Sequence, residues 1–219
     1  MEEIILYFLG ELEKNNNREW FQKNKPLYED AKKAFESFIN SLIPGIARFD
    51  SSVKFVEAKD CTFRIFRDVR FAKDKSPYKN NFGAWITKNG RKSSGPGYYF
   101  HVQPGECFIS GGIHMPDPET LKKIRQEIFY NVVELKRIMA DRSFKKYFTG
   151  IDEWDKQKLP PRDYPKDFEE IDLLKNRSYT ITHPVDKKMV ESEKFSEYVL
   201  KVWQTMYPYN RFLARAVES

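Results

Sequence analysis

Two short turn signals in the middle of the chain constrain its fold more than any other feature. Asn89-Gly90 and Pro104-Gly105 each separate runs of alternating, strand-like residues. Both dipeptides favour tight turns, and strands joined by tight turns pair antiparallel. The pattern predicts an antiparallel, meander-like sheet of about five strands. The expected strands cover residues 53–56, 61–71, 82–87, 97–103 and 106–113, with a later one at 178–183.

Helical periodicity flanks this region on both sides. Apolar residues recur at helical spacing from Ile4 to Leu12, after Pro26 and over residues 119–140. Asn17 is expected to cap a short helix. Pro44-Gly45 is expected to end the next helix, with a further turn through Phe49 as the alternative. Further helices are expected at residues 144–148, 186–207 and 210–217, after an irregular segment at 151–174. Helices, then strands, then helices predict one α+β domain over residues 1–219, with helices flanking the sheet.

The composition needs no special stabilising device. A chain of 219 residues with 40% hydrophobic residues can bury a core without disulfides. Cys61 and Cys107 lack metal-binding spacing, so we expect two small buried hydrophobic side chains. The apolar run at residues 4–9 is too short for a signal peptide or a membrane span. A cytoplasmic protein without a membrane partner is therefore expected.

Positive charge is concentrated in the segment Arg64–Lys79. Six basic residues oppose only Asp68 and Asp74 there, so the segment carries four of the chain's six net positive charges. A local excess of this kind is typical of a site for an anion. A solvated strand edge, on which lysines oppose aggregation, has the same composition. The charge pattern alone leaves both interpretations open.

The expected strand at residues 61–71 gives these charges an arrangement. Alternation places Arg64, Asp68 and Arg70 on one face and Arg67 on the apolar face. An unpaired charge is costly there, so either a bulge redirects Arg67 or a carboxylate such as Asp68 pairs with it. Pro77 restricts the following loop. The candidate anion-binding residues are Arg64, Arg67, Arg70, Lys75, Tyr78 and Lys79, with Asp68 and Asp74 orienting the arginines.

Several motifs resemble one known family. They are Asn16-Asn17-Arg18-Glu19-Trp20-Phe21, the segment Arg64–Lys79, Gly97-Tyr98-Tyr99-Phe100-His101, Gly111-Gly112 and Pro208–Leu213. Together they resemble the family catalogued as domain of unknown function 2461, over essentially the whole chain. Ala72 stands where that family's pattern more often has Ser. The resemblance favours a site at Arg64–Lys79 over a solvated edge, but it implies no reaction, ligand or catalytic residue.

Other kinds of site find little support in the sequence. The three histidines show no metal-ligand spacing, and the glycines lack the phosphate-loop and dinucleotide patterns, so neither a metal nor a cofactor is predicted. A two-residue turn at Pro104-Gly105 would pair His101 with Phe108. His101 is then expected to be a hydrogen-bonded strand histidine rather than a general base.

Three functions remain open at this point. The first is binding of a phosphorylated or otherwise anionic small molecule, with or without catalysis. The second is nucleic-acid binding, in which Tyr78, Trp85 and Tyr98 stack on bases beside the basic segment. The third is a structural or interaction protein in which Arg64–Lys79 forms an internal ion-pair network. The sequence leaves the ligand, any catalytic residue and the oligomeric state open.

Overall fold

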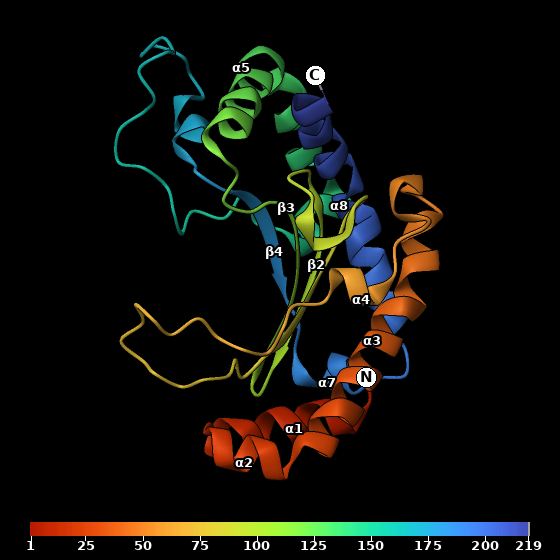
Figure 1. The fold of residues 1–219 in the computed structure, drawn as a ribbon. Coiled ribbons are helices and arrows are strands. Elements are labelled where there is room, and N and C mark those ends of the chain that lie inside the picture. Colours follow the sequence, from red (N-terminus) through yellow and green to blue (C-terminus); the bar gives the residue numbers. More distant parts are fainter. Residues whose placement is uncertain (219) are drawn as a thin grey trace.

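The centre of the molecule is a four-stranded antiparallel sheet of order β1-β2-β3-β4 (Figure 1). The computed structural model describes residues 1–218. Its strands are β1 (Phe82–Ile86), β2 (Gly97–Gln103), β3 (Glu106–Ile113) and β4 (Tyr179–Pro184). The expected α+β class and antiparallel pairing are confirmed, with four strands where about five were predicted.

The two turn signals behave differently. Pro104-Gly105 forms the predicted two-residue turn, because Gln103 pairs with Glu106 across it. His101 consequently lies opposite Phe108, as the sequence predicts. Asn89-Gly90 does not close a tight hairpin. It leads into the 3-10 turn η2 (Gly90–Lys92) within a longer connection between β1 and β2.

Helices precede and follow the strands, as expected. Asn17 caps the second helix by accepting a hydrogen bond from the Trp20 backbone N–H at 2.9 Å. The helices are α1 (Glu3–Lys14), α2 (Arg18–Lys23), α3 (Lys25–Ala47), α4 (Ala58–Cys61), α5 (Pro118–Ala140), α6 (Arg142–Tyr147), α7 (Lys187–Val190) and α8 (Phe195–Glu218). The 3-10 turns η1 (Ser51–Val53) and η3 (Ile171–Lys175) complete the regular elements with η2. No helix within residues 1–218 has the length and apolar character that crossing a membrane requires.

The core lies between one face of the sheet and the helices. Alternate strand residues such as Ala84, Phe100 and Ile109 are fully buried on this face. Phe100 contacts the rings of Phe35 and Phe38 from α3, while α8 packs along β3. Figure 1 shows α3 and α8 together on one side of the strands. The opposite face of the sheet is left to loops.

Some expected elements take another form. Residues 53–56 form the end of η1 and a turn. Cys61 ends α4, and within residues 1–218 the segment after it pairs with its neighbours only through the isolated bridges Thr62↔Ala84 and Phe66↔Tyr78. The expected strand at 61–71 is therefore wrong. The chain leaves the sheet beyond these bridges, and Phe71 is 96% exposed where alternation predicted an apolar face.

A helix end was expected at Pro44-Gly45, with a further turn through Phe49 as the alternative, and a break between two helices was expected at residues 208–209. The helices are continuous at both places. α3 continues through Pro44, and α8 continues through Pro208. Proline removes one helical hydrogen bond, but burial of the residues beyond it can offset that loss. Ile46 in α3 and Phe212 in α8 are such buried residues. The C-terminal helices instead separate before Phe195, where α8 begins.

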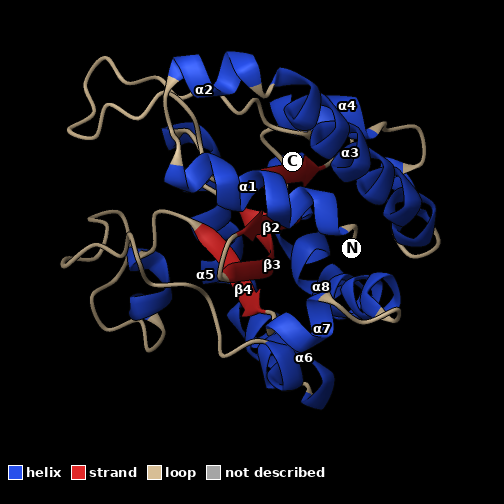
Figure 2. Ribbon diagram, turned by 90° about the horizontal axis from the view of Figure 1, so that it is seen from below, coloured by secondary structure: helices blue, strands red, loops and turns tan. Residues whose placement is uncertain are grey.

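Two long irregular segments extend from the side of the sheet that the helices leave uncovered (Figures 1 and 2). The first, called the arm here, comprises residues 64–79 and adjoins β1. The second, the flanking loop, comprises residues 149–175 and adjoins β4, where the Asp152 N–H donates to the Thr180 carbonyl at 2.8 Å. The open face of the sheet lies between them.

Candidate functional site

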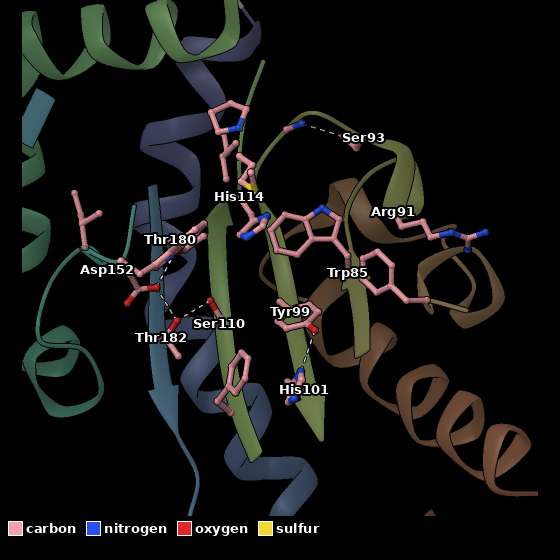
Figure 3. A pocket seen from close by; sticks show the side chains of 18 of the residues that line it. Trp85, Arg91, Ser93, Tyr99, His101, Ser110, His114, Asp152, Thr180 and Thr182 are labelled. Atoms are coloured by element: carbon pink, nitrogen blue, oxygen red, sulfur yellow. Dashed lines mark hydrogen bonds between the residues drawn. The ribbon is translucent and has the colours of Figure 1, made fainter. Parts of the chain in front are cut away.

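The open face of the sheet borders a pocket of about 1200 Å³, called the open-face pocket here (Figure 3). All four strands contribute to it, and the arm and the flanking loop add residues at its rim. Its strand residues alternate with those of the core, so they point away from the helices. They include Trp85, Tyr99, His101, Phe108, Ser110 and Thr182.

Aromatic rings form the floor of the pocket around Tyr99. The Tyr99 ring lies 6.3 Å from Trp85, 5.7 Å from Phe108 and 6.3 Å from Phe63, between ring centroids. Gly83 makes room for this ring, because a Cβ at that position would lie 2.6 Å from the Tyr99 hydroxyl oxygen. The floor therefore offers a planar group several ring faces and edges for contact.

A chain of hydrogen bonds runs from Tyr99 along β2. The His101 Nε2 lies 3.3 Å from the Gln103 Oε1, an acceptor, and the Gln103 amide donates to Glu106. Neutral His101 therefore carries its proton on Nε2, and its Nδ1 accepts from the Tyr99 hydroxyl at 3.1 Å. Burial lowers the pKa of His101 and raises that of Tyr99 to about 12. The Tyr99 hydroxyl oxygen thus presents lone pairs rather than its proton to a ligand.

Hydroxyl groups gather around Asp152 at the β4 side. Thr180 and Thr182 each donate to the Asp152 Oδ2 at 2.7 Å. The Ser110 hydroxyl lies 2.9 Å from the Ile181 carbonyl and 3.1 Å from the Thr182 hydroxyl. Figure 3 shows these side chains together on the left of the pocket. None of them stood out in the charge pattern or the motifs of the sequence.

Two parts of the rim are formed by the stacked rings of His114 and Trp154 and by Arg91, which is hydrogen-bonded to backbone carbonyls. His114 stacks on Trp154 with centroids 5.3 Å apart, and Trp154 is 58% exposed. Arg91 donates to the carbonyls of Lys59, Asp60 and Thr62 at 3.1–3.2 Å. Its guanidinium points away from the sheet in Figure 3, so Arg91 secures the wall beside Phe63.

The base of the arm meets the pocket at Lys79. Its ammonium lies 5.4 Å from the centroid of the Phe63 ring. Burial lowers the pKa of Lys79, and the positive charge of Arg64 lowers it further. Within residues 1–218, neither Lys79 nor Arg64 has a carboxylate oxygen within the 4.0 Å of an ion pair. The two cations therefore leave an uncompensated positive charge beside the aromatic floor.

Two contacts from the N-terminal part of the chain hold this base in place, one from the connection between α1 and α2 and one from α2. The Asn16 side chain donates to the Tyr78 carbonyl at 3.0 Å and accepts from the Tyr78 N–H at 3.1 Å. The Tyr78 ring, which is 3% exposed, stacks on Phe21 with centroids 4.0 Å apart. Tyr78 is thus a packing residue that fixes the backbone next to Lys79.

The arm itself provides partners for Arg67, Arg70 and Lys75. Arg67 pairs with Asp74 at 2.5 Å and also donates to the Ser76 carbonyl, which explains how its charge is accommodated. Arg70 pairs with Asp68 at 2.7 Å. Lys75 donates to backbone carbonyls, the nearer being that of Val69 at 3.0 Å.

These contacts perturb the two carboxyl groups. Hydrogen bonds from Ser76, and then from Arg67, lower the pKa of Asp74, while hydrogen bonds from Arg70 lower that of Asp68. Arg67 and Asp74 border a second, smaller pocket of about 400 Å³, which Lys79 also lines. Of the candidate anion-binding residues, only Lys79 lines the open-face pocket, and Arg64 is its charged neighbour.

The three aromatic residues expected to stack on nucleic-acid bases lie in two different places. Tyr78 and Tyr98 are 3% and 1% exposed, so their rings belong to the core. Of these three aromatic residues, only Trp85 lies in the open-face pocket.

The three histidines do not form a cluster. His101 faces the pocket, His114 lies at its rim, and His183 contacts Tyr147 and Tyr198. No group of three or more potential metal ligands occurs within residues 1–218.

The residues that sequence analysis missed follow a pattern that was visible in the strands. Thr180 and Thr182 alternate with Tyr179 and Ile181, and Tyr99 alternates with its buried neighbours. This alternation marks a polar open face. Asp152 carried no such signal, because its place beside Thr180 depends on the path of the flanking loop.

Comparison with known proteins gives one match. A family model described as "Conserved hypothetical protein (DUF2461)" matches residues 4–212. No curated protein and no solved structure matches the chain.

Proposed function

The chain belongs to the DUF2461 family, and since that description names no activity, we propose its function from the open-face pocket and from the charge of Arg64 beside it. The protein binds a small organic anion, such as a phosphorylated molecule, that carries a planar apolar part. Lys79 and Arg64 hold the anionic group. Phe63, Tyr99 and Trp85 contact the planar part.

The position of Lys79 carries this proposal. Its ammonium is half-buried, lies against Phe63 and is repelled by Arg64 without a carboxylate partner among the described residues. An anion bound between Lys79 and Arg64 would relieve that repulsion and replace the water lost through burial. Since Phe63 contacts Tyr99, an apolar ring attached to the anion would lie directly on the floor.

The outer arm supports a different role for the other arginines. Arg67 and Arg70 already have carboxylate partners, and Lys75 is satisfied by carbonyl groups. Binding an anion there would require those contacts to break. We therefore assign Arg67, Arg70 and Lys75 to the internal structure of the arm, and Arg64 and Lys79 to the ligand.

The test is a titration of the purified protein with phenyl phosphate, followed by calorimetry and by Trp fluorescence. Inorganic phosphate, which lacks the ring, should bind more weakly. Lys79→Gln and Arg64→Gln should each weaken phenyl phosphate binding by about tenfold, the usual value of one charged hydrogen bond.

Arg70→Gln is the matched control, since it removes an equal charge that already has a partner. Its affinity should remain close to that of the wild type. The proposal fails if the wild-type protein shows no saturable binding of phenyl phosphate. It also fails if Arg70→Gln and Lys79→Gln weaken binding equally.

A further inference from the structure

The end of the open-face pocket opposite Lys79 presents an unusual set of hydrogen-bonding groups. Asp152, Ser110, Thr180 and Thr182 all line the pocket there. Within residues 1–218, no Lys, Arg or His nitrogen lies within 4.0 Å of the Asp152 carboxylate, so no ion pair compensates it. The pocket thus has a basic end beside β1 and an acidic end beside β4.

The positions of the hydroxyl hydrogens determine what this acidic end can bind. A hydroxyl group has one hydrogen to donate and lone pairs that accept. Thr180 and Thr182 both direct their hydrogens to the Asp152 Oδ2. The contact of Thr182 with Asp152 is shorter than its contact with Ser110 and is assisted by charge, so it takes the hydrogen.

The Ser110 hydrogen is also committed within the group. Its possible acceptors are the Ile181 carbonyl at 2.9 Å and the Thr182 hydroxyl at 3.1 Å. All three hydroxyl hydrogens are therefore used, and a ligand meets only acceptors. The Asp152 Oδ1 has no hydrogen-bond donor among the described residues, so this oxygen remains available.

A primary ammonium group is the complement of this site. It offers three donors and one positive charge, whereas the site offers several acceptors and one carboxylate. A hydroxyl group would supply one donor and no charge. A hard metal ion prefers six or more oxygens, which one available carboxylate oxygen and three hydroxyls do not supply.

The neighbouring rim suits a cation as well. Trp154 lies two residues after Asp152, lines the same pocket and is 58% exposed. The face of an indole ring attracts a cation held within about 6 Å. His114 stacks on Trp154 and restricts the orientation of the ring.

We propose that Asp152, Ser110, Thr180 and Thr182 form a subsite for a primary ammonium group. This inference rests on the proposed function, since it takes the open-face pocket to be a ligand site, and it adds the chemistry of the far end. The ligand then carries an anionic group at one end and an amine at the other, with a planar part between them. Amine-bearing aromatic phosphates and carboxylates belong to this class.

The test compares phenethylammonium with phenethyl alcohol, which has the same shape without the charge. Wild-type protein should bind the ammonium compound at least about tenfold more tightly than the alcohol. Asp152→Asn should remove that preference. The asparagine oxygen can still accept from both threonines, so the variant keeps the local structure.

Three further measurements separate the possible results. Glu153→Gln removes the adjacent carboxylate, which pairs with Lys156, and should leave the preference for ammonium unchanged. Thr182→Val should weaken ammonium binding by removing one acceptor. Phenyl phosphate should still bind to Asp152→Asn, which shows that the variant is folded and that the basic end remains intact.

Two results overturn the ammonium subsite. In the first, phenyl phosphate binds to the wild type but phenethylammonium does not. In the second, phenethylammonium binds to Asp152→Asn as tightly as to the wild type. In either case the proposed function stands. Equal affinity for the alcohol and the ammonium compound also overturns it, in favour of a hydroxyl subsite. Failure of both phenyl phosphate and phenethylammonium to bind the wild type overturns the subsite and the proposed function together.

Discussion

Gly83 and Gly111 lie on opposite faces of the sheet, and each lets a large neighbour approach the backbone. A Cβ at position 83 would lie 2.6 Å from the Tyr99 hydroxyl oxygen, and one at position 111 would lie 2.1 Å from the Met206 sulfur. Gly83 therefore shapes the open-face pocket, whereas Gly111 lets α8 pack against β3. Single residues without side chains set the spacing on both faces.

Gly83→Ala should displace the Tyr99 ring and destabilise the fold by about 1–3 kcal/mol, as overpacking commonly does. Urea unfolding measures this change. Adding Tyr99→Phe removes the closest clashing atom, so the double variant should recover part of the lost stability. Two ring carbons would remain 3.2 Å from the new Cβ, so full recovery is not expected. Equal stability of Gly83→Ala and the double variant would contradict this account.

The lowered pKa of Lys79 predicts how anion binding depends on pH. A lysine holds an anion only while protonated, and this pKa lies below the ordinary 10.5 because of burial and Arg64. Affinity for phenyl phosphate should therefore fall as pH rises through the lowered pKa, at a lower pH than for an exposed lysine. The phosphate itself keeps its charge above about pH 7.

Calorimetric titrations from pH 7 to 10.5 measure this fall. Lys79→Arg is the control, because arginine keeps its charge across the whole range. A wild-type affinity that stays constant up to pH 10.5 would contradict a role for Lys79. The unfolded chain binds this proton more tightly, so the same group makes the ligand-free fold more stable as pH rises toward 10.5.

Among the elements, the arm has an outer part and a base, which are held in place by different contacts. Its outer part is closed by pairs between exposed side chains, which contribute little to stability. Its base is anchored by Asn16 and by the stacking of Tyr78 on Phe21 of α2. The element that presents Lys79 is therefore held mainly by α2 and the connection before it rather than by its own charges.

Asn16→Ala should cost about 1–3 kcal/mol, because it leaves the N–H and C=O of Tyr78 without their partners. It should also weaken phenyl phosphate binding, since Lys79 follows Tyr78 directly. Chemical denaturation and calorimetry measure the two effects. Asn15→Ala is the control, because the Asn15 side chain bonds only within the end of α1. Comparable losses of ligand affinity in both variants would argue against this anchoring.

Local sequence patterns predicted most of the helices and strands, but they did not predict the conformation of the arm. Alternation and the Pro104-Gly105 turn predicted β2 and β3 at their observed bounds, and helical spacing predicted α5. Alternation also suggested a strand through Phe71, but within the described residues no segment pairs with the chain at that point. Periodicity describes which faces a segment can bury, and it does not show whether a partner is present.

The same distinction applies to the candidate site. The concentration of charge pointed to Arg64–Lys79, and Lys79 does line the open-face pocket. Which charges pair within the arm depends on its fold-back, which brings Asp74 rather than Asp68 to Arg67. Asp152 meets Thr180 and Thr182 only through a long irregular loop. Contacts of that kind depend on tertiary structure, so the sequence alone did not predict them.

At the scale of the whole molecule, the chain has two buried thiols that lie in different regions of the structure. Cys61 ends α4 beside the arm, and Cys107 lies in β3. Both were expected to be buried, and they are 0% and 7% exposed. Burial raises the pKa of each to about 12, so neither forms the reactive thiolate readily at neutral pH.

The two thiols can test the prediction that residues 1–219 form one domain. A thiol reagent such as dithiobisnitrobenzoate at pH 8 should modify both cysteines slowly and at the same rate, because cooperative unfolding exposes them together. Single variants Cys61→Ala and Cys107→Ala assign the rates. Because Cys107 borders the open-face pocket, the informative result is that of Cys61. Modification of Cys61 many times faster than that of Cys107 would indicate that the chain unfolds in separate parts.

In the proposed binding mode, the width of the sheet sets the length of the ligand, because the arm is attached beside β1 and the flanking loop beside β4. The basic and acidic ends of the pocket lie near opposite edges of the sheet, so the number of strands between them sets their separation. Each strand adds about 4.8 Å. A relative with one strand more or fewer would keep both ends and still select a molecule of different length.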